Sequence, residues 1–149
     1  MNTKKLLYTL SFIITAITLS AVTVLFFTLP VLAEKYLRIV GGYTPHNVTM
    51  SVTYGYAALS IAAIALLVLL RLLYTVKCGR VFSIQTNTIM TILSICCFGE
   101  VTVFCLLGSY FLLSYVVAFA ALMLGILLLV LRCVLAEATE IKAENDYTV

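Results

Sequence analysis

Residues 71–87, RLLYTVKCGRVFSIQTN, are a basic segment between two long apolar runs, and they decide how the chain folds. The segment carries Arg71, Lys77 and Arg80, whereas the runs on both sides are almost free of charge. In multi-pass membrane proteins, short loops rich in Lys and Arg face the cytoplasm. Residues 71–87 are therefore predicted to be a cytoplasmic loop between two membrane spans.

The composition of the whole chain also predicts a membrane protein. Of its 149 residues, 64% are apolar and 10% are charged, whereas charged residues reach about 25% in soluble domains. The charges gather at the ends of apolar segments, which argues against direct contact with nucleic acid. The chain has five cysteines without a CxxC pair, and its one histidine, His46, is remote from them in sequence. We therefore expect no disulfide framework, no metal site and no cofactor.

Four apolar stretches are long enough to cross a bilayer as helices, which takes about 20 residues. We expect spans at about 6–29, 50–70, 88–108 and 113–131 in a single membrane domain, 1–149. A first loop would cover Ala33–Thr49, and a cytoplasmic tail would cover 132–149. The first apolar run is longer than the h-region of a signal peptide, about 7 to 15 residues, so a span is favoured over a cleaved leader.

Positive charge also predicts the orientation of the spans. With the N-terminus inside, seven of the nine Lys and Arg residues lie in the cytoplasm: Lys4, Lys5, Arg71, Lys77, Arg80, Arg132 and Lys142. Only Lys35 and Arg38 remain outside. Both termini are therefore expected to be cytoplasmic.

Two spans carry stripes of small residues at helical spacing, which let helix backbones approach closely in lipid. The stripes are Ser51, Gly55, Ala58, Ala62 and Ala65 in the second span, and Ser114, Ala118, Ala121 and Gly125 in the fourth. They favour an all-α fold, a compact integral membrane four-helix bundle. In the first span, the hydroxyls of Ser11, Thr15 and Thr18 are expected to bond across helices or to their own helix carbonyls.

The last span is predicted to continue as a helix beyond the membrane. Residues 131–149, LRCVLAEATEIKAENDYTV, contain no Gly or Pro and keep apolar residues at helical spacing. We expect about two turns or more to project into the cytoplasm, with Glu137, Glu140 and Glu144 able to meet the basic loop. Exposed ion pairs of this kind contribute only about 0–1 kcal/mol each, so such a contact would be adjustable.

Glu100 is the one charged residue within 81–131. An ionisable residue inside a span is costly and is by default a candidate functional residue. No Lys or Arg shares its expected depth, so we expect Glu100 to be protonated at neutral pH. Three interpretations stay open: a carboxylic acid hydrogen-bonded between helices, part of a proton or cation path, or a contact with a partner protein.

Two segments resemble a known family of small bacterial membrane proteins. LLRLLYTVKCGRVFSIQTN and AEATEIKAENDYTV are similar to domain-of-unknown-function family 2975, most specifically at Gly79, Phe82, Ser83, Asn87, Glu144, Asn145, Asp146 and Thr148. Cys78 stands where a polar or acidic residue is expected. The resemblance implies four spans in the bacterial cytoplasmic membrane and genes often placed beside a small helix-turn-helix regulator, and it does not imply any particular enzyme activity.

The first function hypothesis is a non-enzymatic regulator that binds such a helix-turn-helix regulator in the cytoplasm. The candidate partner-binding residues are Arg71, Lys77, Arg80, Phe82, Glu137, Glu140, Glu144 and Asp146. The alternative is a small transporter or channel subunit that uses Glu100, with homo-oligomerisation as one way to build a pore. An intramembrane enzyme is disfavoured because no span contains His or Asp.

Overall fold

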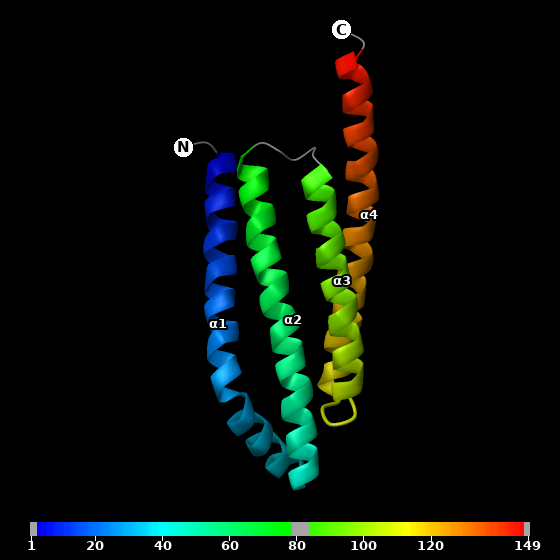
Figure 1. Cartoon of the computed structure of the whole chain (residues 1–149). Coiled ribbons are helices and arrows are strands. Elements are labelled where there is room, and N and C mark those ends of the chain that lie inside the picture. Colours follow the sequence, from blue (N-terminus) through cyan, green and yellow to red (C-terminus); the bar gives the residue numbers. More distant parts are fainter. Residues whose placement is uncertain (1–2, 79–83, 148–149) are drawn as a thin grey trace.

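The computed structural model describes residues 3–78 and 84–147, which form four helices and no strand (Figure 1). The helices are α1 (Thr3–Val40), α2 (Pro45–Lys77), α3 (Ile84–Leu107) and α4 (Leu113–Tyr147). The all-α prediction with four long helices is confirmed. A tight turn at 108–112 joins α3 to α4, between the predicted spans 88–108 and 113–131.

The expected loop over Ala33–Thr49 is wrong, because only residues 41–44 are non-helical. Gly41 has a φ of +79°, a left-handed conformation that ends α1. Thr44 then caps α2: its side chain accepts a 3.1 Å hydrogen bond from the backbone N–H of Asn47, and Pro45 occupies the first turn. These signals start α2 before the apolar run begins.

The helix that contains the first predicted span, 6–29, continues past Pro30 to Val40. Pro30 lies inside α1, and the helix bends in its light-blue second half (Figure 1). Proline removes one backbone donor and its ring displaces a carbonyl of the preceding turn, which kinks a helix without ending it. The bend directs the last part of α1 towards the turn between α3 and α4.

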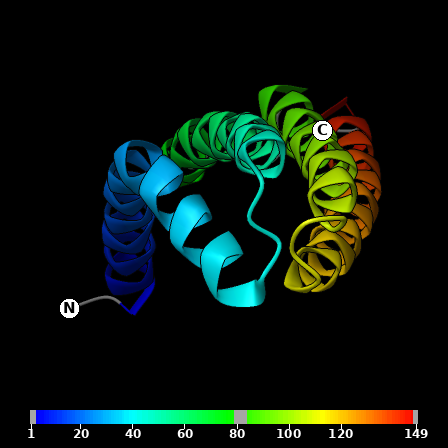
Figure 2. The ribbon, with the colours of Figure 1, turned by 90° about the horizontal axis from the view of Figure 1, so that it is seen from below.

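Each helix packs on its neighbours in sequence, α1 on α2, α2 on α3 and α3 on α4. Seen from below, the four helices follow a curve with α1 and α4 at its ends (Figure 2). The predicted compact bundle is therefore wrong: α2 and α4 do not pack on each other within the described residues, because α3 lies between them.

Small residues make the close contacts, as predicted. Ser51, Ala58 and Ala118 are almost fully buried. The stripe of α2 receives α1, since a Cβ on Gly55 would lie 2.8 Å from Leu29 Cδ2, and the stripe of α4 receives α3, since a Cβ on Gly125 would lie 3.2 Å from Cys97 Cβ. Each stripe thus serves a neighbouring helix instead of the other stripe.

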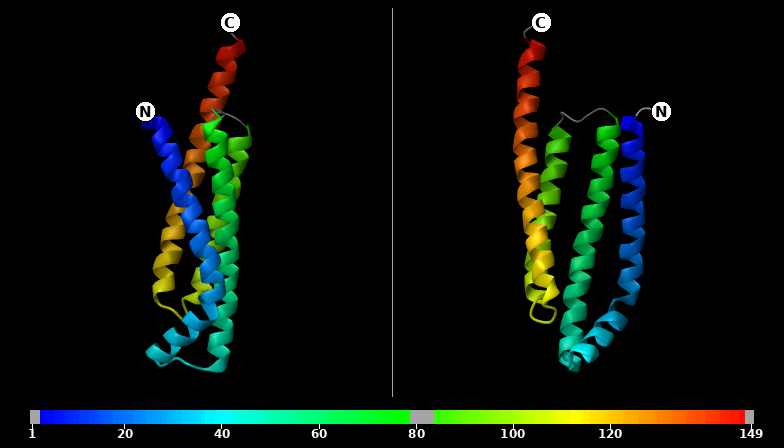
Figure 3. Two further views of the ribbon diagram at one scale, coloured as in Figure 1. Left: turned by 90° about the vertical axis from the view of Figure 1, so that its left-hand side faces the viewer. Right: turned by 180° about the vertical axis from the view of Figure 1, so that it is seen from behind.

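The helices have two distinct ends, which we call the turn end (residues 41–44 and 108–112) and the termini end (Figure 3). The expected loop at 71–87 is shorter than predicted, since Arg71–Lys77 belong to α2 and Ile84–Asn87 to α3. Ser83, one of the residues that carry the family resemblance, lies outside the described residues. At the termini end α4 passes beyond the other three helices (Figure 1).

The length of this overhang follows from one hydrogen bond. Arg132 of α4 is level with Asn87 of α3, because its Nε donates to Asn87 Oδ1 at 3.0 Å. At about 1.5 Å per residue, α4 then continues roughly 18 Å past the start of α3. We call residues 133–147 of α4, which begin beside the first turn of α3 and include this overhang, the projection.

Candidate functional site

Glu100 lies on α3 near the turn end, two turns before the helix ends at Leu107. It shares a helix face with Leu93, Cys97 and Leu107 by the spacing of three, four and seven residues. The Glu100 side chain is half-buried, and its Oε2 is buried without a hydrogen-bond partner. The only ion pair among the described side chains joins Arg38 to Glu34 at the turn end, so Glu100 has no cationic partner there.

The helix around Glu100 is fixed on two sides. Gly99 lies beneath Ile61 of α2, with 3.5 Å between its would-be Cβ and Ile61 Cδ1, and Cys97 lies against Gly125 of α4. These contacts hold α3 between its neighbours at this level and keep the Glu100 carboxyl among helices. Chemically, a carboxyl with a free oxygen in such a place can bind a proton or a cation that reaches it.

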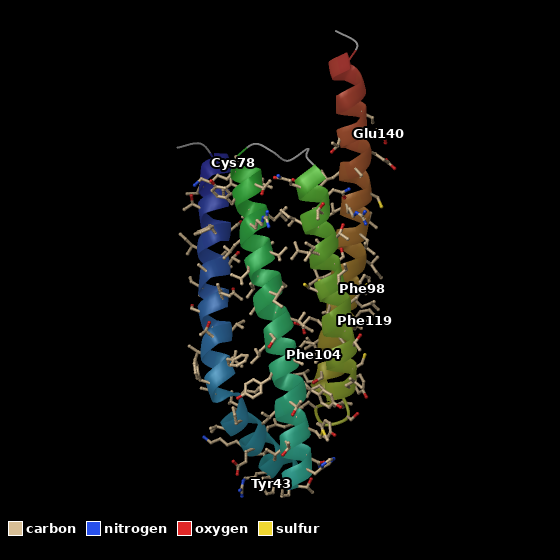
Figure 4. All side chains as sticks on the ribbon, viewed as in Figure 1. Tyr43, Cys78, Phe98, Phe104, Phe119 and Glu140 are labelled. Atoms are coloured by element: carbon tan, nitrogen blue, oxygen red, sulfur yellow. The ribbon has the colours of Figure 1, made fainter. Side chains whose placement is uncertain are left out.

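Four of the residues predicted to bind a partner have described side chains, and these four lie on two helices. Arg71 and Lys77 are exposed on α2, and Glu137 and Glu140 are exposed on the projection of α4. Figure 4 shows Glu140 beyond the ends of the other helices, at the opposite end of the molecule from Tyr43. No ion pair joins the two groups among the described side chains, because α3 separates α2 from α4.

Four of the predicted partner-binding residues have no described side chain. Arg80 and Phe82 lie outside the described residues. Glu144 and Asp146 belong to the helical projection, and only their backbone is described. The predicted contact between the acidic helix and the basic segment therefore stays a prediction where it involves these residues.

The projection carries an apolar row beside its acidic row. Val134 and Ile141, seven residues apart on one face, have exposed fractions of 57% and 61%. Glu137 and Glu140 lie on the adjoining face, and Glu144 continues their spacing in the sequence. A helix that exposes both rows outside the bundle presents a surface of the kind that pairs with another protein.

Sequence reasoning missed the contact that fixes the base of this projection. The Arg132–Asn87 hydrogen bond joins two half-buried polar side chains that are 45 residues apart in the chain. The signal was an Arg at the end of the last apolar run and an Asn shortly before the third. The pairing itself required knowing that α3 and α4 are antiparallel neighbours.

The helices Leu6–Val40, Pro45–Lys77, Gln85–Leu107 and Leu113–Ile141 are each long and apolar enough to cross a membrane. Many of their large apolar side chains point outwards, with exposed fractions of 80% for Phe27 and 62% for Phe119. In water such a surface would aggregate, whereas lipid covers it. The chain is thus a multi-pass membrane protein.

Comparison with models of protein families shows the family of the chain. The model of the family described as "Protein of unknown function (DUF2975)" matches residues 31–149, and the chain belongs to this family. The resemblance noted in the sequence is thereby confirmed. Neither the comparison with curated proteins nor that with solved structures found a match.

Proposed function

We propose that this protein is a non-enzymatic regulator in the bacterial cytoplasmic membrane that binds a cytoplasmic partner through the projection of α4. The observation that carries the proposal is the projection itself: it extends roughly 18 Å beyond α3 and exposes Val134 and Ile141 beside Glu137 and Glu140. A helix that served only to cross the membrane would end near Arg132.

Charge supports a cytoplasmic location for the termini end. The described basic residues Arg71, Lys77 and Arg132 lie there, whereas Lys35 and Arg38 lie at the turn end. The positive-inside rule then orients the termini end, and with it the projection, towards the cytoplasm. Partner and projection would thus share a compartment.

The partner we propose is a small helix-turn-helix transcription regulator, as the family resemblance suggests. Such a regulator binds DNA through a basic face. The acidic row of the projection is complementary in sign to that face, and the apolar row beside it supplies the contact area that exposed charges alone do not. Binding would hold the regulator at the membrane and compete with DNA.

The test is recovery of the partner from gently solubilised membranes with a tagged protein. A chain that ends at Leu135 lacks the acidic row, and the double variant Glu137→Lys/Glu140→Lys reverses it within a full-length chain. The matched control is Glu34→Lys, the same change at the turn end. We expect the first two to lose a co-purifying DNA-binding protein and the control to keep it. Equal recovery from all variants would refute the proposal.

A second function is favoured by a separate observation, the unpartnered Oε2 of Glu100. The alternative is a small transporter or channel subunit in which this carboxyl binds a proton or cation, with several copies of Glu100 around one path in a homo-oligomer. In proteoliposomes, Glu100→Gln should abolish proton or cation flux while Glu140→Gln preserves it. Absence of flux in the unmodified protein would remove this alternative.

A further inference from the structure

A groove opens at the turn end, away from the projection. It has a volume of about 400 Å³ and lies between the bent part of α1, the start of α2, the end of α3 and the start of α4. Leu29, Leu32, Leu107 and Val117 line it with aliphatic carbon, and none of the residues around it carries a charge. This volume lies within the range of about 300–1,000 Å³ found for small-molecule sites.

Ser51 forms part of the wall of this groove and has an exposed fraction of 2%. Its hydroxyl is buried and has no hydrogen-bond partner. Other hydroxyls of α2 behave differently: Thr53, Ser60 and Thr75 each donate to the carbonyl four residues earlier, at 2.7–2.9 Å. A buried hydroxyl without a partner costs about 1–3 kcal/mol, so Ser51 carries an unmet hydrogen bond inside an apolar site.

Two aromatic side chains form part of the wall of the groove. The rings of Tyr36 on α1 and Phe111 in the α3–α4 turn pack with their centroids 4.7 Å apart, and both residues line the groove. The bend of α1 at Pro30 is what brings Tyr36 to this turn, although α1 and α4 are otherwise separate. The groove thus depends on the bend of α1 at Pro30.

We propose that this groove binds an uncharged apolar molecule that carries one hydrogen-bonding oxygen, such as a long-chain alcohol, with the oxygen at Ser51. The absence of charge in the lining excludes ionic headgroups, because a buried charge needs a partner. The unmet hydrogen bond of Ser51 distinguishes this ligand from a plain lipid tail, which would leave the hydroxyl unsatisfied. The site is at the opposite end from the proposed partner surface and does not depend on it.

The test uses two photoreactive probes in proteoliposomes, a long-chain alcohol and the alkane of equal length, with labelled residues located by mass spectrometry. We expect the alcohol to label the groove more strongly than the alkane does. Loss of one neutral hydrogen bond in Ser51→Ala should lower alcohol labelling about two- to tenfold and leave alkane labelling unchanged. Labelling around Phe119, which faces outwards, serves as an internal reference.

Two further variants make the result decisive. Ser60→Ala removes a hydroxyl of α2 that is bonded to Tyr56 and should not alter labelling. Val117→Phe narrows the groove from an exposed position on α4 and should reduce labelling by both probes. Equal labelling of the groove by the two probes, or unchanged alcohol labelling in Ser51→Ala, would show that only lipid tails occupy it and would overturn the proposal.

Discussion

Arg132 Nε lies 3.0 Å from Asn87 Oδ1, which ties the last helix to the beginning of the third. The Arg132 guanidinium donates a charge-assisted hydrogen bond to the side-chain oxygen of Asn87, and both side chains are half-buried. The contact sits where the packed part of α4 ends and the projection begins, so it sets the direction in which the projection leaves the bundle.

Removing this hydrogen bond should destabilise the α3–α4 pair. Hydrogen bonds to charged groups contribute about 1.5–3 kcal/mol, and we expect Asn87→Ala and Arg132→Gln each to lower the free energy of unfolding by about this amount. Denaturant titration in detergent micelles measures the change. Arg71→Gln, at an exposed position of α2, is the control and should have little effect. Equal effects of Arg71→Gln and Arg132→Gln would contradict the assignment.

Gly108 is required where α3 turns towards α4. A Cβ at this position would overlap the ring of Tyr115. We expect Gly108→Ala to destabilise the fold by about 1–3 kcal/mol, and Tyr115→Ala to restore most of the loss in the double variant. Gly99→Ala is the matched control, because its Cβ would meet Ile61 at an ordinary 3.5 Å and alanine favours a helix. Thermal unfolding in detergent compares the three.

The bend at Pro30 should determine the contact between Tyr36 and Phe111. In a cysteine-free background, a short bismaleimide should cross-link Tyr36→Cys to Phe111→Cys, because the native rings are in contact. Adding Pro30→Ala restores the missing backbone hydrogen bond, straightens α1 and should reduce the cross-link several-fold. A cross-link that Pro30→Ala leaves unchanged would show that the bend has another cause.

The proposed orientation predicts opposite accessibility for the two ends. A membrane-impermeant maleimide added to intact cells should label Tyr43→Cys at the turn end and leave Cys78, which is exposed at the termini end, unlabelled. Permeabilised cells provide the control, since both thiols should then react. Labelling of Cys78 in intact cells would show the opposite topology, in which the projection faces away from the cytoplasm and cannot reach a cytoplasmic partner.

Much of this fold could be predicted from sequence because each helix contains a long apolar run. The number of helices follows from the four apolar stretches, and the helical tail follows from the absence of Gly and Pro in residues 131–149. The extent of the helices around Pro30 and Pro45 could not be predicted, because proline can bend a helix or begin one, and which occurs depends on packing and capping around it.

The candidate functional residues also divide into those that the sequence alone indicates and those that only the structure reveals. Exposed Glu137 and Glu140 and half-buried Glu100 were recognisable as charges in unusual places. Ser51 was read as one member of a small-residue stripe, and its missing hydrogen bond is visible only where the carbonyls and neighbouring helices have positions. The groove likewise depends on the bend of α1, which no spacing of residues encodes.

The order of packing has a consequence for biosynthesis. Since α1 packs on α2, α2 on α3 and α3 on α4, each helix–helix interface among the described residues forms between segments that leave the ribosome in succession. The contact between Tyr36 of α1 and Phe111 of the α3–α4 turn forms later, whereas the low sequence separation of the helix–helix interfaces favours rapid assembly. The fold can therefore form by adding one helix at a time to a growing edge, with α4 the last of the four.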